Sequence, residues 1–562
     1  MVYLDEIKKE LSEILGCSPK SFVYPPNSEM GDLSLPMFEM AKKKGLNPVE
    51  LAKTIASSFS DSNSDIVKSA KATGPYLNFH LEPINFVGNS LNDISEQGSK
   101  FGTNNKGNND GIMIEYSNGN THKEIHIGHL RNISYGNSVC KILEANGYDV
   151  VPVSYINDFG IFVAKTLWNW QKNPEYAESD APKGYLLGKC YSEASLKIGD
   201  DEVAKKEVGE IMKSIESRTG NDYKLWQETR QWSIDYFNEV YKDLGIKFSD
   251  TFYESDFIEA GLKIKDDLLA KGILKLSEGA IIADLEEYGL GVLPVIRSDG
   301  TALYPVADLA LASAKFDKYK LKESIYIVDV RQSLYFSQLF KLVELLGYKE
   351  KMTHLSYDFL TLKSGMMASR TGNVITYKEL LDQALLRTTS EIKARHEDWS
   401  AEKVLEVAHG LSLSAIKFEM IKVSSDKVIT FDIDDALKFE GFTSAYLQYT
   451  GARICSLLKK GEELESAPVD FKELAEAKEF KLVLKMEQYS DAIVKAGIER
   501  DPSIIARYLF ELAQDFNDYY HDVNIMKAET SVRVVRLALV KNIKQVLENG
   551  FNILGLTYLT EM

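Results

Sequence analysis

Cysteine is scarce in this chain of 562 residues, and its placement excludes two kinds of scaffold. The four cysteines are scattered, with no Cys-x-x-Cys pair among them: Cys17, Cys140, Cys190 and Cys455. Disulfide-stapled domains and structural zinc sites both need cysteines at short, regular spacings. The sequence therefore predicts neither a disulfide framework nor a structural metal.

Long apolar runs are also missing, and positive charge is in deficit. No apolar stretch reaches transmembrane length, and the amphipathic, acidic N-terminus has no signal-peptide core. We therefore expect a cytoplasmic protein with no membrane partner. Lys and Arg number 66 against 83 Asp and Glu, a formal net charge of −17. This acidity argues against indiscriminate nucleic-acid binding, so a polyanion partner would have to bind a local basic patch.

Residues 112–160 carry the most informative pattern, a strand, a turn, a helix and a second strand. Ile112 to Tyr116 is apolar at strand length, apolar residues recur at helical spacing from Ile127 to Gly147, and Val150 to Ile156 predicts the second strand. The tetrapeptide His126-Ile127-Gly128-His129 lies where the turn becomes the helix. Free N–H groups at a helix N-terminus bind phosphate, and glycine allows close approach. The stretch predicts a nucleotide site.

This tetrapeptide resembles the first signature of the class I aminoacyl-tRNA synthetases, and its surroundings are similar to the arginyl-tRNA synthetases. The shared pattern is Glu-Tyr-Ser-x-x-Asn-x-x-Lys-x-x-His-Ile-Gly-His-Leu-Arg, from Glu115 to Arg131, followed by Asn157-Asp158-Phe159-Gly160. Many members have proline where this chain has Gly119, a change that affects only the stiffness of the turn.

The resemblance implies a ligase that joins arginine to ATP as arginyl-adenylate, releases diphosphate and passes the arginyl group to tRNA(Arg). Mg²⁺ would travel with the ATP. The resemblance also implies that tRNA binds before arginine is activated. We expect a monomer.

The resemblance and the element pattern predict a multidomain α/β protein with a Rossmann-type parallel-sheet core. We expect an N-terminal α+β tRNA-binding domain with helices near 3–15, 34–45 and 48–59 and a strand at 76–81. The predicted domains are 1–104 (N-terminal), 105–362 (catalytic, with an insertion at about 165–290), 363–440 (signature loop and stem contact) and 441–562 (all-helical, anticodon-binding).

The second half of the sheet is expected to resume near Gly291 with a hairpin over residues 292–304, because Asp299-Gly300 favours a tight turn. The pattern then predicts helices and buried strands in alternation, with an almost wholly helical chain from Tyr377 onward. The predicted ranges are a helix at 305–319, a strand at 324–330, a helix at 334–346 and a strand at 354–359.

Arginine is planar and always charged, so a pocket that selects it needs carboxylates. The resemblance assigns this role to Glu115 and Asp308, with Tyr304 one helical turn before Asp308. It assigns Asn120 and Gln332 to the α-amino and α-carboxylate groups of the substrate. ATP would face His126, Gly128 and His129, the two histidines acting catalytically.

The second class I signature is degenerate in this chain. Residues 366–373 read Met-Met-Ala-Ser-Arg-Thr-Gly-Asn, so the Gly-Asn end fits and both lysines of the family pattern are missing. Its position after the last sheet strand still predicts ATP contacts from Met367, Ser369 and Arg370. We expect Lys123, three residues before the first signature histidine, to supply the missing catalytic charge.

The C-terminal helices resemble the anticodon-binding domain of the family. Tyr446, Tyr449 and Arg453 are spaced to share one helix face, which suits stacking on bases and contact with phosphate. Two other functions remain open at this point. A non-catalytic tRNA-binding paralogue would show eroded pocket residues, and a small-molecule nucleotidylyltransferase would not need the flanking RNA-binding units.

Overall fold

A parallel five-stranded sheet forms the centre of the computed structural model, which describes residues 2–60, 65–363, 375–464, 469–474 and 476–562. Its strand order is β11-β10-β4-β5-β6. All four pairings are parallel, so the carboxyl ends of the strands share one edge. The strands are β4 (Gly111–Glu115), β5 (Asp149–Ile156), β6 (Asp250–Tyr253), β10 (Glu323–Asp329) and β11 (Lys351–Tyr357).

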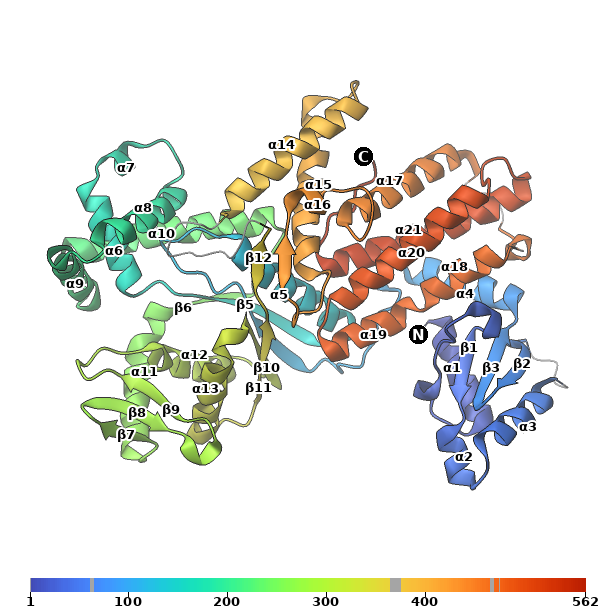
Figure 1. Ribbon diagram of the computed structural model, residues 1–562, viewed down its shortest axis with the longest axis horizontal. Helices are drawn as coiled ribbons and strands as arrows, with labels where there is room; N and C mark the ends of the chain where they lie inside the picture. The colour runs from blue at the N-terminus through green and yellow to red at the C-terminus, as the bar shows by residue number, and fades with distance from the viewer. Residues whose placement is uncertain (1, 61–64, 364–374, 465–468, 475) are drawn as a thin grey trace.

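Strand β6 lies inside the range predicted as the insertion, so that prediction is wrong at its C-terminal end. Residues 250–253 pair with 153–156 of β5 and form an edge of the sheet. A four-residue edge strand, Asp-Thr-Phe-Tyr, is too short to show a period. The helices between β5 and β6 are α6 (Ile161–Lys172), α7 (Glu175–Glu178), α8 (Lys183–Ile198), α9 (Glu202–Glu216) and α10 (Gly220–Asp243). We call these five helices the insertion; they form the upper left of Figure 1.

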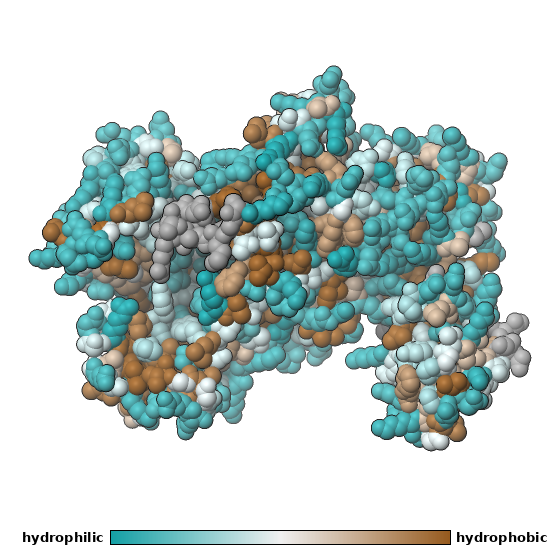
Figure 2. All heavy atoms as spheres, viewed as in Figure 1, coloured by the Kyte–Doolittle hydropathy of each residue, from teal (hydrophilic) through white to brown (hydrophobic). Residues whose placement is uncertain are grey.

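The predicted hairpin at 292–304 does not belong to the central sheet. Strand β9 (Val292–Ile296) joins β7 (Leu274–Ser277) and β8 (Ala280–Asp284) in a separate antiparallel sheet. The second arm is reduced to one bridge, Ile296 to Ala302. Helices α11 (Glu254–Ala270), α12 (Tyr304–Lys318) and α13 (Ser333–Leu346) complete this lobe, where apolar residues gather on the face seen in Figure 2.

Helix α5 (Ile127–Ala145) begins at the signature tetrapeptide and is buried on nearly every side. It packs on β5 and also against helices from the last third of the chain, among them α15 (Ala401–Ile421), α19 (Tyr489–Glu499) and α21 (Thr530–Leu554). Ser138 Oγ donates to the carbonyl of Leu554 at 3.1 Å, and Lys141 Nζ donates to that of Asn552 at 2.8 Å. The helix therefore links the sheet to the C-terminal helices.

The N-terminal unit contains the antiparallel sheet β1-β3-β2 and four helices, shown in blue in Figure 1. The helix predicted at 34–45 starts later, because Leu33–Pro36 forms strand β1 and pairs with residues 76–79. Lys8 Nζ lies 2.6 Å from Asp491 Oδ2, an ion pair with helix α19. The elements are α1 (Tyr3–Leu15), β1 (Leu33–Pro36), α2 (Phe38–Lys44), α3 (Pro48–Ser60), β2 (Val67–Thr73), β3 (Tyr76–Leu81) and α4 (Pro83–Gln97).

The chain after residue 377 is mostly helical, as predicted, apart from β13 (Ile429–Phe431), which pairs with β12 (Leu360–Leu362). The helices are α14 (Tyr377–Arg395), α15 (Ala401–Ile421), α16 (Ile433–Ala436), α17 (Ser444–Lys460), α18 (Ala477–Glu487), α19 (Tyr489–Glu499), α20 (Ser503–Asp522) and α21 (Thr530–Leu554). In the described parts of the chain, no helix combines the length and apolarity needed to cross a bilayer.

Candidate active site

The turn between β4 and α5 is supported from behind by helix α10 of the insertion. Ser117 and His122 have positive φ angles of 59° and 61°. Ser117 Oγ donates to Tyr241 Oη at 2.8 Å, and the His122 N–H donates to Ser233 Oγ at 2.9 Å. A Cβ at Gly119 would lie 3.2 Å from the Phe237 ring. The insertion, for which the sequence suggested no role, thus holds the signature turn in shape.

His126 and His129 stack with their ring centroids 3.8 Å apart at the N-terminus of α5. The Gly128 N–H donates to His126 Nδ1, and the His126 N–H donates to His129 Nδ1, both at 3.1 Å. Burial lowers the pKa of His126 to about 4 and that of His129 well below its usual value, and Lys123 adds to both shifts. Both rings are therefore neutral at pH 7, and each carries its proton on Nε2, because Nδ1 accepts. They present two N–H donors without a full charge.

A cavity of about 440 Å³ opens at the carboxyl edge of the central sheet. All five residues predicted to bind arginine line it, together with one signature histidine: Glu115, Asn120, Tyr304, Asp308, Gln332 and His129. Lys123, His126 and Gly128 are not among its lining residues. The topology thus brings together residues separated by more than 200 positions in the chain. A cavity of this size and place is typical of a small-molecule site.

Asp308 lies in the wall of this cavity and accepts a hydrogen bond from the Tyr335 hydroxyl. Burial raises the pKa of Asp308 to about 6, and the nearby charge of Glu115 adds to the rise, while the Tyr335 hydrogen bond opposes it. Tyr304, the first residue of α12, is 61% exposed at the rim. Asp308 is therefore a carboxylate that gains from a cationic ligand.

Glu115 differs from Asp308 because its carboxylate already has a cationic partner. Lys315 Nζ forms an ion pair with Glu115, and both side chains are almost completely buried. The lysine also lies over the Tyr326 ring, 4.5 Å from its centroid. Lys315 follows Asp308 by seven residues on the same helix, so both side chains face the cavity. Lys315, which nothing in the sequence singles out, occupies the position beside Glu115 where the substrate guanidinium was expected.

Glu254 is a buried carboxylate that interacts electrostatically with Asp308 and was not predicted from the sequence. It is the first residue of α11, directly after β6, and only 8% of it is exposed. Its Oε2 atom has no hydrogen-bond partner among the described residues. Burial raises the pKa of Glu254 to about 8, and the charges of Asp308 and Asp158 add to the rise. Its position at the carboxyl end of a sheet strand would have indicated a functional role, but β6 could not be predicted from the sequence.

The second signature, with Met367, Ser369 and Arg370, lies outside the described residues. The residues that follow it contact the first signature directly. The Ile127 N–H donates to the Ile375 carbonyl at 3.1 Å, and the Tyr377 N–H donates to the Ile125 carbonyl at 2.8 Å. The backbone of residues 375–377, which follow the second signature, is therefore hydrogen-bonded to the backbone of residues 125–127 at the first signature.

Lys123 points its ammonium group toward the insertion. Nζ lies 4.7 Å from the centroid of the Phe162 ring and 4.9 Å from that of Tyr191. Within the described ranges no carboxylate pairs with it. Burial lowers the pKa of Lys123, and the charge of Lys165 lowers it further.

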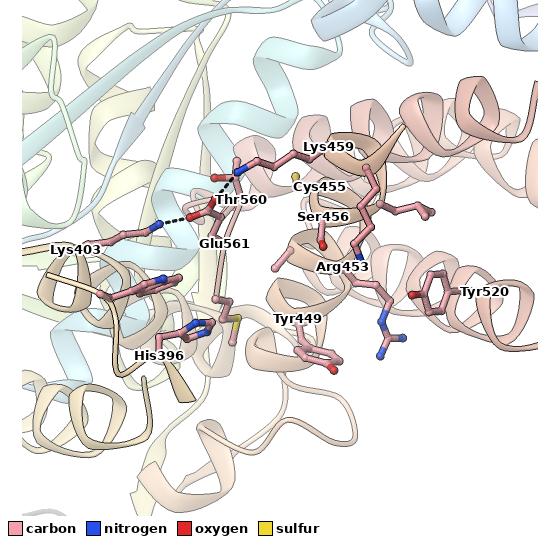
Figure 3. A pocket seen from close by; sticks show the side chains of 15 residues that line it. His396, Lys403, Tyr449, Arg453, Cys455, Ser456, Lys459, Tyr520, Thr560 and Glu561 are labelled. Atoms are coloured by element: carbon pink, nitrogen blue, oxygen red, sulfur yellow. Dashed lines mark hydrogen bonds and ion pairs between the residues drawn. The ribbon is translucent and has the colours of Figure 1, made fainter. Parts of the chain in front are cut away.

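A second cavity, of about 690 Å³, lies among α14, α15, α17, α20 and the C-terminal residues (Figure 3). Tyr449 and Arg453 line it, and the Arg453 guanidinium lies 4.8 Å from the Tyr449 ring centroid and 5.0 Å from that of Tyr520. Tyr446 is not among the lining residues: its hydroxyl accepts from Asn517 Nδ2 at 2.9 Å. Two of the three predicted tRNA-binding residues thus meet in one site.

Comparisons with known proteins agree with this geometry. Three family models match the chain: "Arginyl tRNA synthetase N terminal domain" over 1–81, "tRNA synthetases class I (R), catalytic domain" over 90–432, and "DALR anticodon binding domain" over 447–562. A Bdellovibrio bacteriovorus protein described as arginine–tRNA ligase is 34% identical over 96% of this chain and 93% of its own length. A Borrelia hermsii protein of the same description is 31% identical over 99% of this chain and all of its own.

Solved structures agree as well. The Thermus thermophilus arginyl-tRNA synthetase superposes with a TM-score of 0.81 at 25% identity, covering 100% of this chain and 99% of its own. The Plasmodium falciparum enzyme shares the fold, with a TM-score of 0.75 at 20% identity over 100% and 98% of the two chains. With the family models and relatives spanning nearly its whole length, the chain belongs to the arginyl-tRNA synthetases of class I.

Proposed function

We propose that this chain charges tRNA(Arg) with arginine and activates arginine only after tRNA has bound. In the family reaction the arginine carboxylate attacks the α-phosphate of ATP, diphosphate leaves, and the arginyl group passes from the adenylate to the terminal adenosine of tRNA. No covalent enzyme intermediate is needed, so the site contributes positioning and charge stabilisation. The observation that carries the proposal is that all five predicted arginine-binding residues line the same cavity.

The guanidinium would pair with Asp308, which lines the cavity and has no ion-pair partner within the described ranges. Glu254 is not among the lining residues, but the charge of Asp308 helps to raise its pKa, so a cation bound at Asp308 would also reduce the repulsion between the two carboxylates. Lys315 would hold Glu115 in place as a neutral pair. Asn120 and Gln332 remain the proposed contacts of the α-amino and α-carboxylate groups.

ATP would bind with Mg²⁺ across the N-terminus of α5. The Nε2–H groups of His126 and His129 would donate to phosphate oxygens, and Gly128 would let the nucleotide approach the backbone. Lys123 would bring the positive charge that the second signature lacks, with Met367, Ser369 and Arg370 contacting ATP from the facing loop.

Pyrophosphate exchange measured with each of the twenty amino acids, with and without tRNA, tests the function. We expect exchange with arginine alone, and only when tRNA is present. A non-catalytic tRNA-binding paralogue would show no exchange under any condition. A small-molecule nucleotidylyltransferase would show no dependence on tRNA or amino acid, and either result would contradict the proposal.

The cavity shown in Figure 3 would receive an unpaired base of the tRNA anticodon, stacked on Tyr449 beside the Arg453 guanidinium. We expect Tyr449→Ala to lose roughly 1–3 kcal/mol of tRNA affinity, the value of one base stack. Fluorescence titration with tRNA(Arg) measures the change.

Two controls accompany this variant. Tyr449→Phe keeps the ring and should bind nearly as wild type. Tyr446→Phe removes a hydroxyl that accepts from Asn517 outside the cavity lining; because Asn517 also accepts from Arg453, this change should cost less affinity than Tyr449→Ala. Wild-type affinity in Tyr449→Ala would show that this face is only packing.

We also propose that the protein is a monomer in the cytoplasm and has no membrane partner. Light scattering at micromolar concentration tests the first point.

A further inference from the structure

The ammonium group of Lys123 is held by two aromatic rings that come from the insertion. Phe162 is the second residue of α6, and Tyr191 lies in the middle of α8. The Nζ atom is 4.7 and 4.9 Å from the two ring centroids, within the range of a cation–π contact. We call Phe162 and Tyr191 the aromatic clamp.

The kind of partner matters for a lysine that is to act on phosphate. A carboxylate would neutralise the ammonium and would itself repel the phosphates of ATP. Ring faces attract the cation through their quadrupole and carry no net charge. In the described parts of the chain Lys123 has no carboxylate partner, so no neighbouring negative charge offsets the ammonium that the clamp holds.

Close packing of α8 on the signature turn keeps the clamp in place. A Cβ at Gly188 would lie 2.3 Å from Glu124 Cγ and 2.9 Å from the Glu124 backbone nitrogen, so only glycine permits this approach. Tyr191 follows Gly188 by three residues and lies on the same face of α8. The helix thus touches Glu124 with its backbone and the neighbouring Lys123 with a ring.

The charge of Lys123 also acts on the two histidines at the end of the signature turn. It contributes to the lowered pKa of both His126 and His129. The clamped ammonium therefore acts electrostatically on the two histidines that we propose as phosphate ligands.

We propose that Phe162 and Tyr191 are positioning residues for adenylate formation, which hold the Lys123 ammonium beside the ATP phosphates without touching substrate themselves. This inference depends on the proposed role of Lys123. It gives insertion helices α6 and α8 a part in the reaction, in addition to the support that α10 gives to the turn.

The test uses the full-length enzyme with tRNA(Arg) and compares Phe162→Leu, Tyr191→Leu and the double variant in arginine-dependent pyrophosphate exchange. We expect kcat to fall roughly 3-fold in each single variant and roughly 10-fold in the double variant, in line with loss of cation–π contacts. The KM for arginine should not change. Tyr191→Phe keeps the ring and should restore the rate.

Two controls separate positioning from damage to the insertion. Tyr223→Leu removes a ring of α10 that stacks on Trp226, and it should leave kcat unchanged. In a Lys123→Ala background the double variant should cause no further loss, because the clamp then has nothing to hold.

The outcomes separate the role of Lys123 in adenylate formation from the role of the aromatic clamp. A normal rate in Lys123→Ala would refute the role of the lysine, and the clamp would fail with it. A slow Lys123→Ala enzyme combined with normal kcat in the clamp variants would overturn the clamp alone. So would equal losses from the double variant in both backgrounds. If the double variant does not fold, the two single variants and Tyr191→Phe carry the same comparison.

Discussion

Asp308→Asn is expected to weaken arginine binding by roughly 2–5 kcal/mol, the cost of leaving a buried charge without its partner. The KM for ATP should change little, because Asp308 lies on α12, whereas the signature histidines lie at the start of α5. The asparagine retains the shape of the carboxylate and can still accept the Tyr335 hydrogen bond. Steady-state exchange kinetics with each substrate varied in turn give the two values.

A pH series makes the prediction sharper. Without ligand the pKa of Asp308 is raised to about 6, so below that pH the residue holds a proton that must leave before it can pair with a guanidinium. The KM for arginine should therefore fall as the pH rises through about 6 in the wild type, and this step should be missing in Asp308→Asn. Equal losses for arginine and ATP would remove Asp308 from the amino-acid pocket.

Lys123→Ala is expected to slow adenylate formation by roughly 10²–10³, with arginine binding little changed. Negative charge builds up on the α-phosphate as the arginine carboxylate attacks, and alanine leaves no ammonium on this side of the phosphates. Single-turnover formation of arginyl-adenylate in the presence of tRNA measures the step directly.

A compensating substitution checks that the loss concerns charge. Ser369 stands where most class I enzymes have the second lysine of the loop, so Ser369→Lys in the Lys123→Ala enzyme should restore part of the rate. A Lys123→Ala enzyme that activates arginine at the normal rate would end the hypothesis. Arg370 would then be the next candidate for the missing charge.

Local periodicity explains which elements could be predicted. The strand, helix and second strand predicted within residues 112–160 match β4, α5 and β5 to within a residue or two at each end. Each has a continuous apolar pattern and a clear stop signal. The sequence predicts a helix from residue 34, where the structure has the strand Leu33–Pro36, because only four alternating residues precede helix α2. Strand β6 could not be predicted for the same reason, because its four residues are too few to show a period.

Side-chain partners were harder to predict, because they depend on segments distant in sequence. Nothing near Glu115 in the sequence shows that Lys315, two hundred residues later, occupies its carboxylate. Glu254 has the sequence surroundings of an ordinary helix residue, and only the pairing of β6 with β5 places it at the edge of the sheet. The spacing of Tyr446 and Tyr449 predicts the same role for both. Only the packing of α20 against α17 distinguishes them: Tyr446 bonds Asn517 of α20, and Tyr449 lines the cavity.

The burial of α5 has a consequence for how the protein is made. A ribosome delivers the signature helix early, yet the surfaces that cover it include α15, α19 and α21, and its Ser138 hydroxyl bonds the carbonyl of Leu554. We therefore expect one side of this helix to stay uncovered during synthesis until α21 has emerged, more than 400 residues after the helix itself ends. A chain truncated before α21 is accordingly expected to leave a face of the signature helix uncovered, in addition to lacking its C-terminal end.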